Sequence, residues 1–307
     1  MCCHSLVLNG RTWVRRIDHC IVCLMTDSIL DTSAPSRDRR QRVQAAVTGM
    51  MLLKGLARLG GRATLTLLAR HVDENPAKVH RYLISMIEEG LVVQDPVSLQ
   101  YQLGPESIQI GLAAMRLADP VRSAEPSLVR LRQSLEMTCF VAVMGNKGPT
   151  IVRFEEPGLP VTLNVRVGSV LSVIWSATGR VFLAYLDDSR MERLAQEELA
   201  QVTPSQRTTL DAMDPIGHLK AQTRSVGMAI VRDTNLQGIS AIGAPVFDFS
   251  GKLVAVVTVL GATGMFDEAT MDRVMRALKE ETQAISTGLG QPVATLSPPL
   301  ELTNPLG

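Results

Sequence analysis

The sequence of 307 residues contains no long apolar run. A membrane-spanning helix needs about 20 consecutive apolar residues. The longest candidate here, residues 253–266, is interrupted by glycine and threonine and is typical of a buried strand. The N-terminal segment also lacks the uninterrupted apolar core of a secretory signal peptide. We therefore expect a cytoplasmic location and no membrane partner.

Motifs of the common enzyme classes are missing as well. There is no GxxxxGK[ST] phosphate-binding loop and no GxGxxG dinucleotide fingerprint. After the first 24 residues the only histidines are His71, His80 and His218, and none lies in a pattern that pairs a nucleophile with a base. We expect no catalytic residue, no cofactor and no metal ion. These absences argue against the alternative of an enzyme whose N-terminal module serves only protein contacts.

Cysteine is rare outside the N-terminal segment. Four of the five cysteines lie within the first 23 residues, and two of them, Cys20 and Cys23, have the spacing of metal ligands. A metal- or redox-responsive sensor is therefore a second alternative, built on Cys2, Cys3, Cys20 and Cys23. The surroundings of this pair lack turn glycines and a second pair with matching spacing, so we expect no metal site. Residues 1–36 are instead predicted to be a disordered or non-native extension, with translation beginning near Met25. Cys139 has apolar neighbours and is predicted to lie in the core.

Charge is unevenly distributed along the chain. Residues 37–104 contain ten Lys and Arg against six Asp and Glu, whereas residues 105–307 contain 18 against 21. A basic front part beside an acidic rear part favours one module that binds a polyanion and a second module with another task.

The front part, residues 37–104, has the pattern of a winged helix-turn-helix. Apolar residues recur at helical spacing over residues 41–58, and a second, short helix is expected over residues 65–72. Asn75 and Pro76 suit the N-cap and the first position of a third helix. Two short strands around a polar turn follow, at residues 91–94 and 100–103. Helix, helix, tight turn, helix and hairpin is the order of a winged helix-turn-helix.

The apolar residues of these helices predict which faces are buried. For the first helix the predicted face comprises Val43, Val47, Met50, Met51, Leu53 and Leu56. For the third helix it comprises Val79, Leu83, Met86 and Ile87.

The rear part alternates strands and helices. Gly104-Pro105 is expected to break the chain before a linker helix, residues 105–120, which runs from Ile108 to Leu117. Residues 121–290 are predicted to form an α+β domain with a largely antiparallel sheet. Residues 291–307 hold four prolines and no periodicity, which predicts a disordered tail. Strands are expected at residues 138–144, 149–156, 161–167, 228–231, 239–247 and 252–260. Helices are expected at residues 121–136, 175–186, 190–200, 209–225 and 267–287.

Several short motifs, in order and spacing, resemble the IclR family of bacterial transcription regulators. In the front part they are KVHRYL (78–83), EEGLV (88–92) and YQLGP (101–105). In the rear part they include RVG (166–168), SATGR (176–180), APV (244–246) and SGK (250–252). The resemblance covers residues 40–290 and implies a GAF-like effector-binding domain behind the winged helix-turn-helix. It also implies a dimer or tetramer that binds a pseudo-palindromic operator in double-stranded DNA and responds to a small carboxylate or aromatic metabolite.

Polar side chains off the apolar face of the third helix are the candidate DNA contacts. Lys78 and Arg81 suit phosphates or guanine edges, and His80 and Ser85 suit hydrogen bonds to bases. Taken alone, such residues equally describe a solvated helix face; the wing and the resemblance favour DNA. A basic cluster ahead of the first helix suits the minor groove or adds only non-specific attraction. The candidate set is Arg40, Ala77, Lys78, His80, Arg81, Tyr82 and Ser85, and packing against the first helix is the alternative for Tyr82.

The start of the helix near residue 176 is the candidate effector site. Ser176 suits the N-cap, and the first N–H groups of such a helix are free to meet an anion. A plain capped helix is the alternative, and it is the resemblance that implies a pocket here. Family positions that are frequently cysteine, acidic or hydroxyl-bearing read Ala241, residues 230–233 and Leu260, so we expect an organic carboxylate with an apolar or aromatic body. The expected pocket residues are Ile174, Trp175, Ser176, Ala177, Thr178, Arg232, Ala241, Thr258 and Leu260, with a core position as the alternative for Trp175.

Overall fold

The computed structural model describes residues 6–8, 11–13, 43–158 and 166–292. By its internal contacts the chain divides into two compact units, Met1–Tyr82 and Leu83–Gly307. This division falls inside a helix, so it does not test the predicted borders at residues 36, 104, 120 and 290, which remain predictions. Within the predicted N-terminal extension, β1 (Leu6–Leu8) pairs antiparallel with β2 (Arg11–Trp13). Outside the described residues lie Arg40, Cys2, Cys3, Cys20, Cys23 and residues 293–307.

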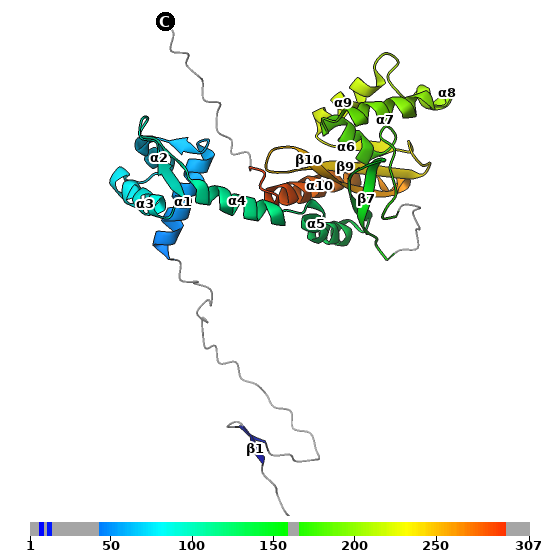
Figure 1. Cartoon of the computed structure of the whole chain (residues 1–307). Helices are drawn as coiled ribbons and strands as arrows, with labels where there is room; N and C mark the ends of the chain where they lie inside the picture. The colour runs from blue at the N-terminus through cyan, green and yellow to red at the C-terminus, as the bar shows by residue number, and fades with distance from the viewer. Residues whose placement is uncertain (1–5, 9–10, 14–42, 159–165, 293–307) are drawn as a thin grey trace, which may run out of the picture. The chain divides into compact units, whose positions relative to one another are not determined.

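The first unit holds the opening helices of the front part (Figure 1). They are α1 (Gln44–Arg58), α2 (Leu65–His71) and the beginning of α3 (Pro76–Glu88), with the two-residue strand β3 (Arg62–Ala63) between the first two. The start of α3 is as predicted. Asn75 Oδ1 accepts a hydrogen bond from the Ala77 N–H at 2.8 Å, and Pro76 occupies the first helical position.

Helix α1 buries a different face from the one predicted. Its buried residues are Thr48, Gly49, Leu52, Gly55 and Leu56. Of the predicted face, Leu56 is buried, but Val47 is 44% exposed and Met50 is 54% exposed, and Val43 is exposed as well. Apolar residues follow two stripes of this helix, and packing covers only one of them. In α3, Val79, Leu83 and Met86 are buried as predicted, whereas Ile87, at the edge of the stripe, is exposed.

The second unit begins within α3 and continues into the predicted hairpin. Strands β4 (Val92–Gln94) and β5 (Tyr101–Leu103) pair antiparallel. Asp95 shapes their connection, because its Oδ1 accepts hydrogen bonds from the N–H groups of Val97 and Ser98. Helix α4 (Pro105–Leu117) starts at Pro105 and not at Ile108 as predicted. Pro105 therefore begins the helix, where the sequence predicted a break, because the missing N–H of proline is tolerated at the first position of a helix.

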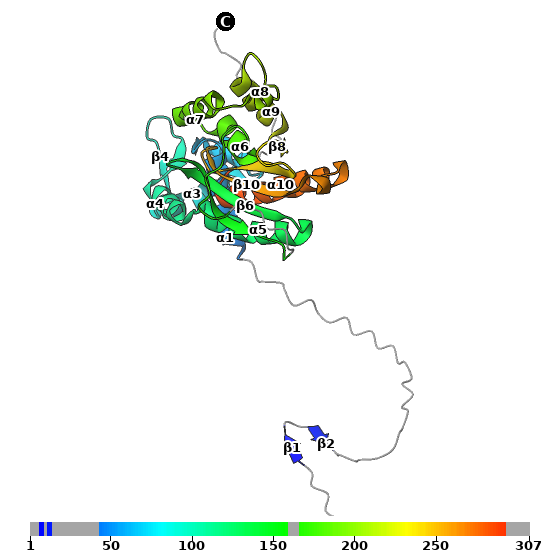
Figure 2. The same ribbon diagram turned by 90° about the vertical axis from the view of Figure 1, so that its right-hand side faces the viewer.

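A five-stranded antiparallel sheet forms the centre of the second unit (Figure 2). Its strand order is β7-β6-β10-β9-β8. The strands are β6 (Thr138–Gly145), β7 (Gly148–Glu155), β8 (Ala229–Arg232), β9 (Ile239–Phe247) and β10 (Leu253–Ala262). All five were predicted to within two residues at each end. The predicted strand 161–167 lies mostly outside the described residues, and 166–167 are not in a strand.

Helices cover both faces of this sheet. On one face α5 (Pro120–Leu135) and α10 (Glu268–Gly288) pack over Cys139, Val141 and Val257. On the other face α6 (Ala177–Tyr185) packs over Phe140, Ala142 and Val256. This split follows from the two-residue alternation of side chains along a strand. Cys139 is a core residue as predicted: its Sγ donates to the Leu128 carbonyl, and burial raises the pKa of its thiol to about 12.

Three further helices follow α6, and one of them differs from its prediction. They are α7 (Ser189–Ala200), the short α8 (Pro204–Arg207) and α9 (Pro215–Val226). The helix predicted over residues 209–225 begins only at Pro215. Asp214 is the N-cap and accepts from the Gly217 N–H at 2.9 Å, so its carboxylate ends the preceding loop and starts the helix. Among the described residues, no helix is long and apolar enough to cross a membrane.

Gly179 in α6 is expected to tolerate no side chain. A Cβ atom there would lie 2.0 Å from the Ser172 carbonyl oxygen and 2.6 Å from Val173 Cα, and both are backbone atoms. We expect Gly179→Ala to lower the free energy of unfolding by about 3 kcal/mol or more, as overpacking against backbone does. Urea unfolding of the whole chain measures this change. The control is Gly288→Ala at the end of α10, where a Cβ meets nothing within 4 Å; an equal loss in both variants would contradict the packing argument.

Candidate functional site

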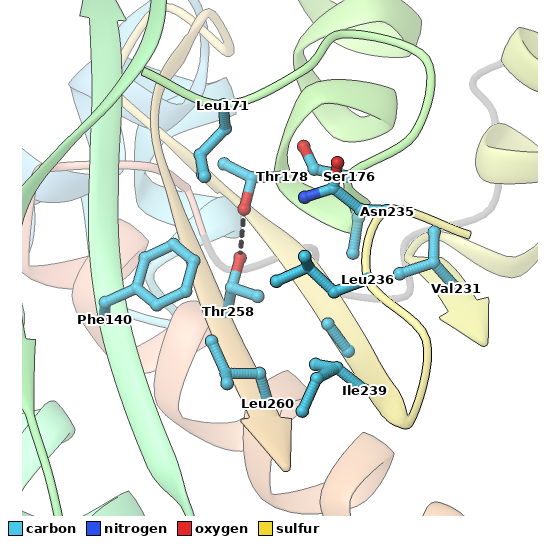
Figure 3. A pocket seen from close by; sticks show the side chains of 12 residues that line it. Phe140, Leu171, Ser176, Thr178, Val231, Asn235, Leu236, Ile239, Thr258 and Leu260 are labelled. Carbon is cyan, nitrogen blue, oxygen red and sulfur yellow. Dashed lines mark hydrogen bonds between the residues drawn. The ribbon is translucent and has the colours of Figure 1, made fainter. Parts of the chain in front are cut away.

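A cavity lies between the first turn of α6 and the sheet (Figure 3). Its volume is about 60 Å³. Side chains from β6, β8, β9 and β10, from α6 and from the loop between β8 and β9 surround it. The lining residues are Phe140, Leu171, Ser176, Ala177, Thr178, Val231, Asn235, Leu236, Ile239, Ala241, Thr258 and Leu260.

The turn ahead of α6 is held by a carboxylate from a distant helix. Glu198 of α7 accepts hydrogen bonds from the Ser172 hydroxyl at 2.6 Å, the Val173 N–H at 2.7 Å and the Ile174 N–H at 3.0 Å. Within the turn, Ser172 Oγ accepts from the Trp175 N–H at 2.8 Å. This carboxylate therefore satisfies the donors of a turn that has no regular secondary structure of its own.

The start of α6 is capped as the sequence predicted. Ser176 Oγ accepts from the Gly179 N–H at 2.9 Å and donates to the Ser172 carbonyl. The N–H groups of Ala177 and Thr178 have no acceptor among the described residues. This first turn lies against β9 at Gly243, where a Cβ would come within 3.2 Å of the Ala177 carbonyl carbon. The free N–H groups and the positive end of the helix dipole thus belong to the wall of the cavity.

Polar atoms occupy one end of a mainly apolar cavity. Thr178 Oγ1 and Thr258 Oγ1 lie 2.8 Å apart, and Figure 3 shows the two side chains pointing at each other. A single hydroxyl hydrogen serves this bond, so one of the two hydroxyls keeps a hydrogen to donate to a ligand. No charged side chain is among the described residues that line the cavity. A ligand there would meet neutral donors and an apolar wall.

A loop over residues 233–238 borders the cavity with Asn235 and Leu236. Asp233 anchors the loop, because its Oδ1 accepts from the Gly238 N–H at 2.7 Å and from the Thr263 hydroxyl at 2.8 Å. The Thr234 hydroxyl donates to the Trp175 carbonyl at 2.8 Å. Both ends of the loop are therefore fixed.

Six of the nine expected pocket residues line the cavity and three do not. Those that line it are Ser176, Ala177, Thr178, Ala241, Thr258 and Leu260. Arg232 lies on the other face of β8, where its guanidinium donates to the Phe266 carbonyl at 3.0 Å. Ile174 is fully buried and Trp175 is half-buried in the core beside α6, so of the expected apolar wall only Leu260 lines the cavity.

Six lining residues were not predicted from the sequence: Phe140, Leu171, Val231, Asn235, Leu236 and Ile239. For Ile239 a signal existed, because it is two residues from the expected Ala241 on a strand whose alternate residues share a face. Leu171, Asn235 and Leu236 lie in irregular segments, where no periodicity indicates which side chains point inward.

The candidate DNA contacts are mostly on the open face of α3. Ala77, His80, Arg81 and Ser85 are exposed. Lys78 is partly buried, and its Nζ forms an ion pair with Glu74 at 2.7 Å. The side chain of Tyr82 is half-buried, which fits the alternative of packing within the front part.

Comparison with known families settles the class of protein. The model of the IclR helix-turn-helix domain matches residues 45–96, and that of the bacterial transcriptional regulator IclR C-terminal domain matches residues 113–287. The second match alone spans more than half of the chain. The chain belongs to the IclR family.

Individual relatives agree with this membership. The IclR-family chain is similar to the DNA-binding transcriptional repressor YiaJ of Escherichia coli K12, with 24% identity over 258 residues, 84% of this chain and 92% of YiaJ. It is similar to the crystal structure of Pseudomonas aeruginosa HmgR, with 37% identity and a TM-score of 0.73 over 81% of this chain and 99% of HmgR. The Agrobacterium tumefaciens repressor BlcR has the same fold, with 20% identity and a TM-score of 0.67 over 82% of this chain and 99% of BlcR.

These names establish the kind of activity. The relatives are transcription regulators, so this chain is a DNA-binding transcription regulator of the IclR type and not an enzyme. The predicted fold class is confirmed: a helix-turn-helix domain precedes an α+β domain with an antiparallel sheet.

Glu198 is expected to stabilise the fold through the turn at residues 172–174. Glu198→Gln replaces two acceptor oxygens by one and places an amide N–H against backbone donors. We expect a loss of about 1–3 kcal/mol in the free energy of unfolding, measured by urea unfolding. The matched control is Glu197→Gln, whose carboxylate is 61% exposed and 4.0 Å from Arg193; exposed pairs of this kind contribute about 0–1 kcal/mol. Equal effects in the two variants would contradict the role of Glu198.

Proposed function

We propose that this regulator binds an operator as a dimer or tetramer, and that a small organic carboxylate in the cavity beside α6 changes its affinity for DNA. The observation that carries the ligand part is the cavity itself. It joins unbonded N–H groups at the start of α6 to an apolar wall, with no acidic side chain among its described lining residues. We also propose a cytoplasmic location, because a transcription regulator acts where the chromosome is.

The DNA-reading role is proposed for α3. Its exposed residues Ala77, His80, Arg81 and Ser85 form a polar face, opposite the buried Val79 and Leu83. An α-helix fits the major groove, where base edges present distinct donors and acceptors. Arg81 is suited to the acceptors of guanine, whereas Lys78 and Tyr82 are partly buried and suit phosphate contacts at the edge of that face. Arg40 is proposed to add backbone or minor-groove contacts.

The chemistry of the cavity favours a carboxylate. Two N–H groups of a helix N-terminus, one free hydroxyl hydrogen of the Thr178–Thr258 pair and the Asn235 side chain offer donors, and no acidic lining residue repels an anion. A carboxylate at a helix N-terminus gains from charge-assisted hydrogen bonds. Phe140, Leu260 and Ile239 would contact its apolar part (Figure 3).

The size of the cavity limits the ligand. Its volume of about 60 Å³ exceeds the about 10–15 Å³ that one water needs, so there is room for a small ligand. A short aliphatic acid is the smaller of the two expected ligand classes, and an aromatic acid would also lie against the half-exposed Leu236.

Self-association is proposed from helix α4, which buries none of its residues. Ile108, Leu112 and Met115 are exposed at i, i+4 and i+7, so they form an apolar stripe along the helix. A helix of 13 residues is marginal without packing. A second copy of the chain that covers the stripe would stabilise α4, and a two-fold dimer would match a pseudo-palindromic operator.

Effector and operator communicate only through a difference between two states. The acid changes DNA affinity only if it binds the DNA-competent and DNA-incompetent states unequally. Helix α4 follows the hairpin directly in the chain and precedes α5, so we propose it as the connection that differs between these states.

Arg81→Ala is expected to weaken operator binding while leaving the fold intact. Arg81 is exposed, so its truncation creates no cavity. A lost base contact costs about 1–3 kcal/mol of binding free energy, which a gel-shift titration across a salt series measures. Val79→Asp should instead unfold the front part, because it places a charge at a buried position. Wild-type affinity of Arg81→Ala at every salt concentration would remove α3 as the reading helix.

Butyrate is expected to bind the intact protein at least about tenfold more tightly than butyramide, because only the acid carries the charge that the start of α6 favours. Isothermal titration calorimetry measures both. Ala241→Leu should weaken butyrate binding by at least about tenfold, since its side chain would occupy the cavity. The control is Ala212→Leu at an exposed loop position, which should bind like wild type. Equal affinities for acid and amide would contradict the ligand class, and unchanged binding in Ala241→Leu would contradict the place.

Leu112→Glu is expected to dissociate the oligomer, because it puts a charge in the middle of the α4 stripe. Light scattering after size-exclusion chromatography gives the mass of the particle. The matched control is Gln109→Glu, a substitution to the same residue on another side of α4, which should leave the mass unchanged. A monomeric wild-type protein, or a variant of unchanged mass, would contradict the proposed role of α4.

A further inference from the structure

A second, smaller cavity lies on the far side of α6, between α6, α9 and β8. Its volume is about 40 Å³. Contacts join each pair of these three elements, and Figure 2 shows them beside one another. The lining residues are Arg180, Gln222, Thr223, Val226, Met228, Ala229 and Ile230. It shares no residue with the cavity at the start of α6.

Arg180 faces this cavity with most of its hydrogen-bonding capacity unused. A guanidinium has five N–H donors. Its Nε donates to the Ile174 carbonyl at 2.7 Å, and among the described residues neither Nη atom has an acceptor and no carboxylate forms an ion pair with it. Burial lowers the pKa of Arg180 to about 10. A partly desolvated cation with no counter-charge is an unfavourable arrangement unless an anion accompanies it.

Thr223 supplies an independent sign of a ligand. Its residue is only 3% exposed, yet its hydroxyl has no hydrogen-bond partner among the described residues. Of the other buried threonines, Thr138 also lacks a side-chain partner among the described residues, whereas Thr282 donates to the Leu278 carbonyl at 2.8 Å. Buried polar groups in folded proteins nearly always have a partner. Because Thr223 lines the same cavity as Arg180, one small acceptor would serve both side chains.

The edge of the sheet adds a backbone donor. Strand β8 is the last strand of the sheet, so one of its sides has no neighbouring strand. Residues of an antiparallel pair alternate between bonded and non-bonded positions. The Asp233 N–H donates to the Ile239 carbonyl, so residue 233 is at a bonded position. In the register of β8 and β9, Ile230 is then at a non-bonded position, and its N–H points away from β9. Ile230 lines the cavity, so a further N–H donor lies at its border.

We propose that this cavity is a second ligand site, which binds the carboxylate group of a small organic acid between Arg180, Thr223 and the edge of β8. The size agrees with a small group, because about 40 Å³ exceeds the about 10–15 Å³ that one water needs. The donors agree as well, since a guanidinium fork and a hydroxyl match the two oxygens of a carboxylate. Gln222, on the exposed side of α9, offers an amide at the entrance.

The test uses formate, which has three non-hydrogen atoms, and its neutral counterpart formamide. Transverse relaxation of ¹³C-formate in the presence of the intact protein detects weak binding, at constant ionic strength set with sodium chloride. Formate should be broadened and formamide should not. The broadening should persist in Ala241→Leu, which fills only the cavity at the start of α6.

Two variants address the site itself. In the Ala241→Leu background, where the cavity at the start of α6 is filled, Arg180→Gln should abolish the broadening. Thr223→Val keeps the shape of the side chain and removes only the hydroxyl, so the fold is retained and the affinity should fall by about tenfold, the effect of one hydrogen bond to a charged group. The matched control is Thr282→Val, a buried threonine of α10 outside this cavity, which should bind formate like wild type.

The outcomes separate this proposal from the effector site. In the Ala241→Leu background, broadening that survives both Arg180→Gln and Thr223→Val overturns the second site. Broadening that is lost in Ala241→Leu and kept in Arg180→Gln places formate at the start of α6; this result also overturns the second site and leaves the proposed effector site standing.

Discussion

Close backbone packing at the start of α6 is the constraint on which both cavities depend. Gly179 lets the helix approach the turn at residues 172–173, and Gly243 lets the same helix approach β9. The Glu198 carboxylate then fixes the turn through three hydrogen bonds. With the helix held on both sides, its first N–H groups reach one cavity, and its fourth residue, Arg180, reaches the other. A larger residue at either glycine would separate these surfaces, because backbone atoms cannot rotate away as side chains do.

Helix α6 therefore contributes positive charge to both cavities, a partial charge from its dipole and a full charge from a side chain. Its dipole points the partial charge of the N-terminus into the mainly apolar cavity. Its Arg180 carries a full charge to the border between α9 and β8. The Arg180 Nε also donates to the Ile174 carbonyl, in the turn that Glu198 holds, so the two cavities have a turn in common. One acid would influence the binding of another through this turn only if each bound two states of it unequally.

Apolar surface that the chain does not cover is concentrated on helices outside the sheet domain. Helix α4 buries nothing, and α1 leaves Val43, Val47 and Met50 open on the side away from its core. The sheet domain, in contrast, buries its apolar residues in two layers. This difference distinguishes a sheet domain with two buried layers from helices that leave apolar faces exposed, the kind of surface at which proteins associate.

The sequence by itself determined the class of the protein and most of its elements. Periodicity and capping residues such as Asn75 and Ser176 act over a few residues, so they predicted α3 and α6 correctly. The five strands followed from apolar runs, and the order of short motifs indicated the family. Predictions from local pattern alone were wrong for two helices. Helix α1 has two apolar stripes and buries only one of them, and α9 begins at Pro215 and not at residue 209.

Only the tertiary structure decided which side chains meet. Arg232 and Val231 are neighbours, and strand alternation sends one to α10 and the other into the cavity. Glu198 reaches the turn at residues 172–174 from 24 to 26 residues away, and Thr178 meets Thr258 across 80 residues. Distances of this kind depend on how helices pack on a sheet and not on local propensity. That is why the resemblance could indicate Ala177, Thr178 and Thr258 as neighbours at one cavity, while Phe140, Asn235 and Leu236 were found beside them only in the folded chain.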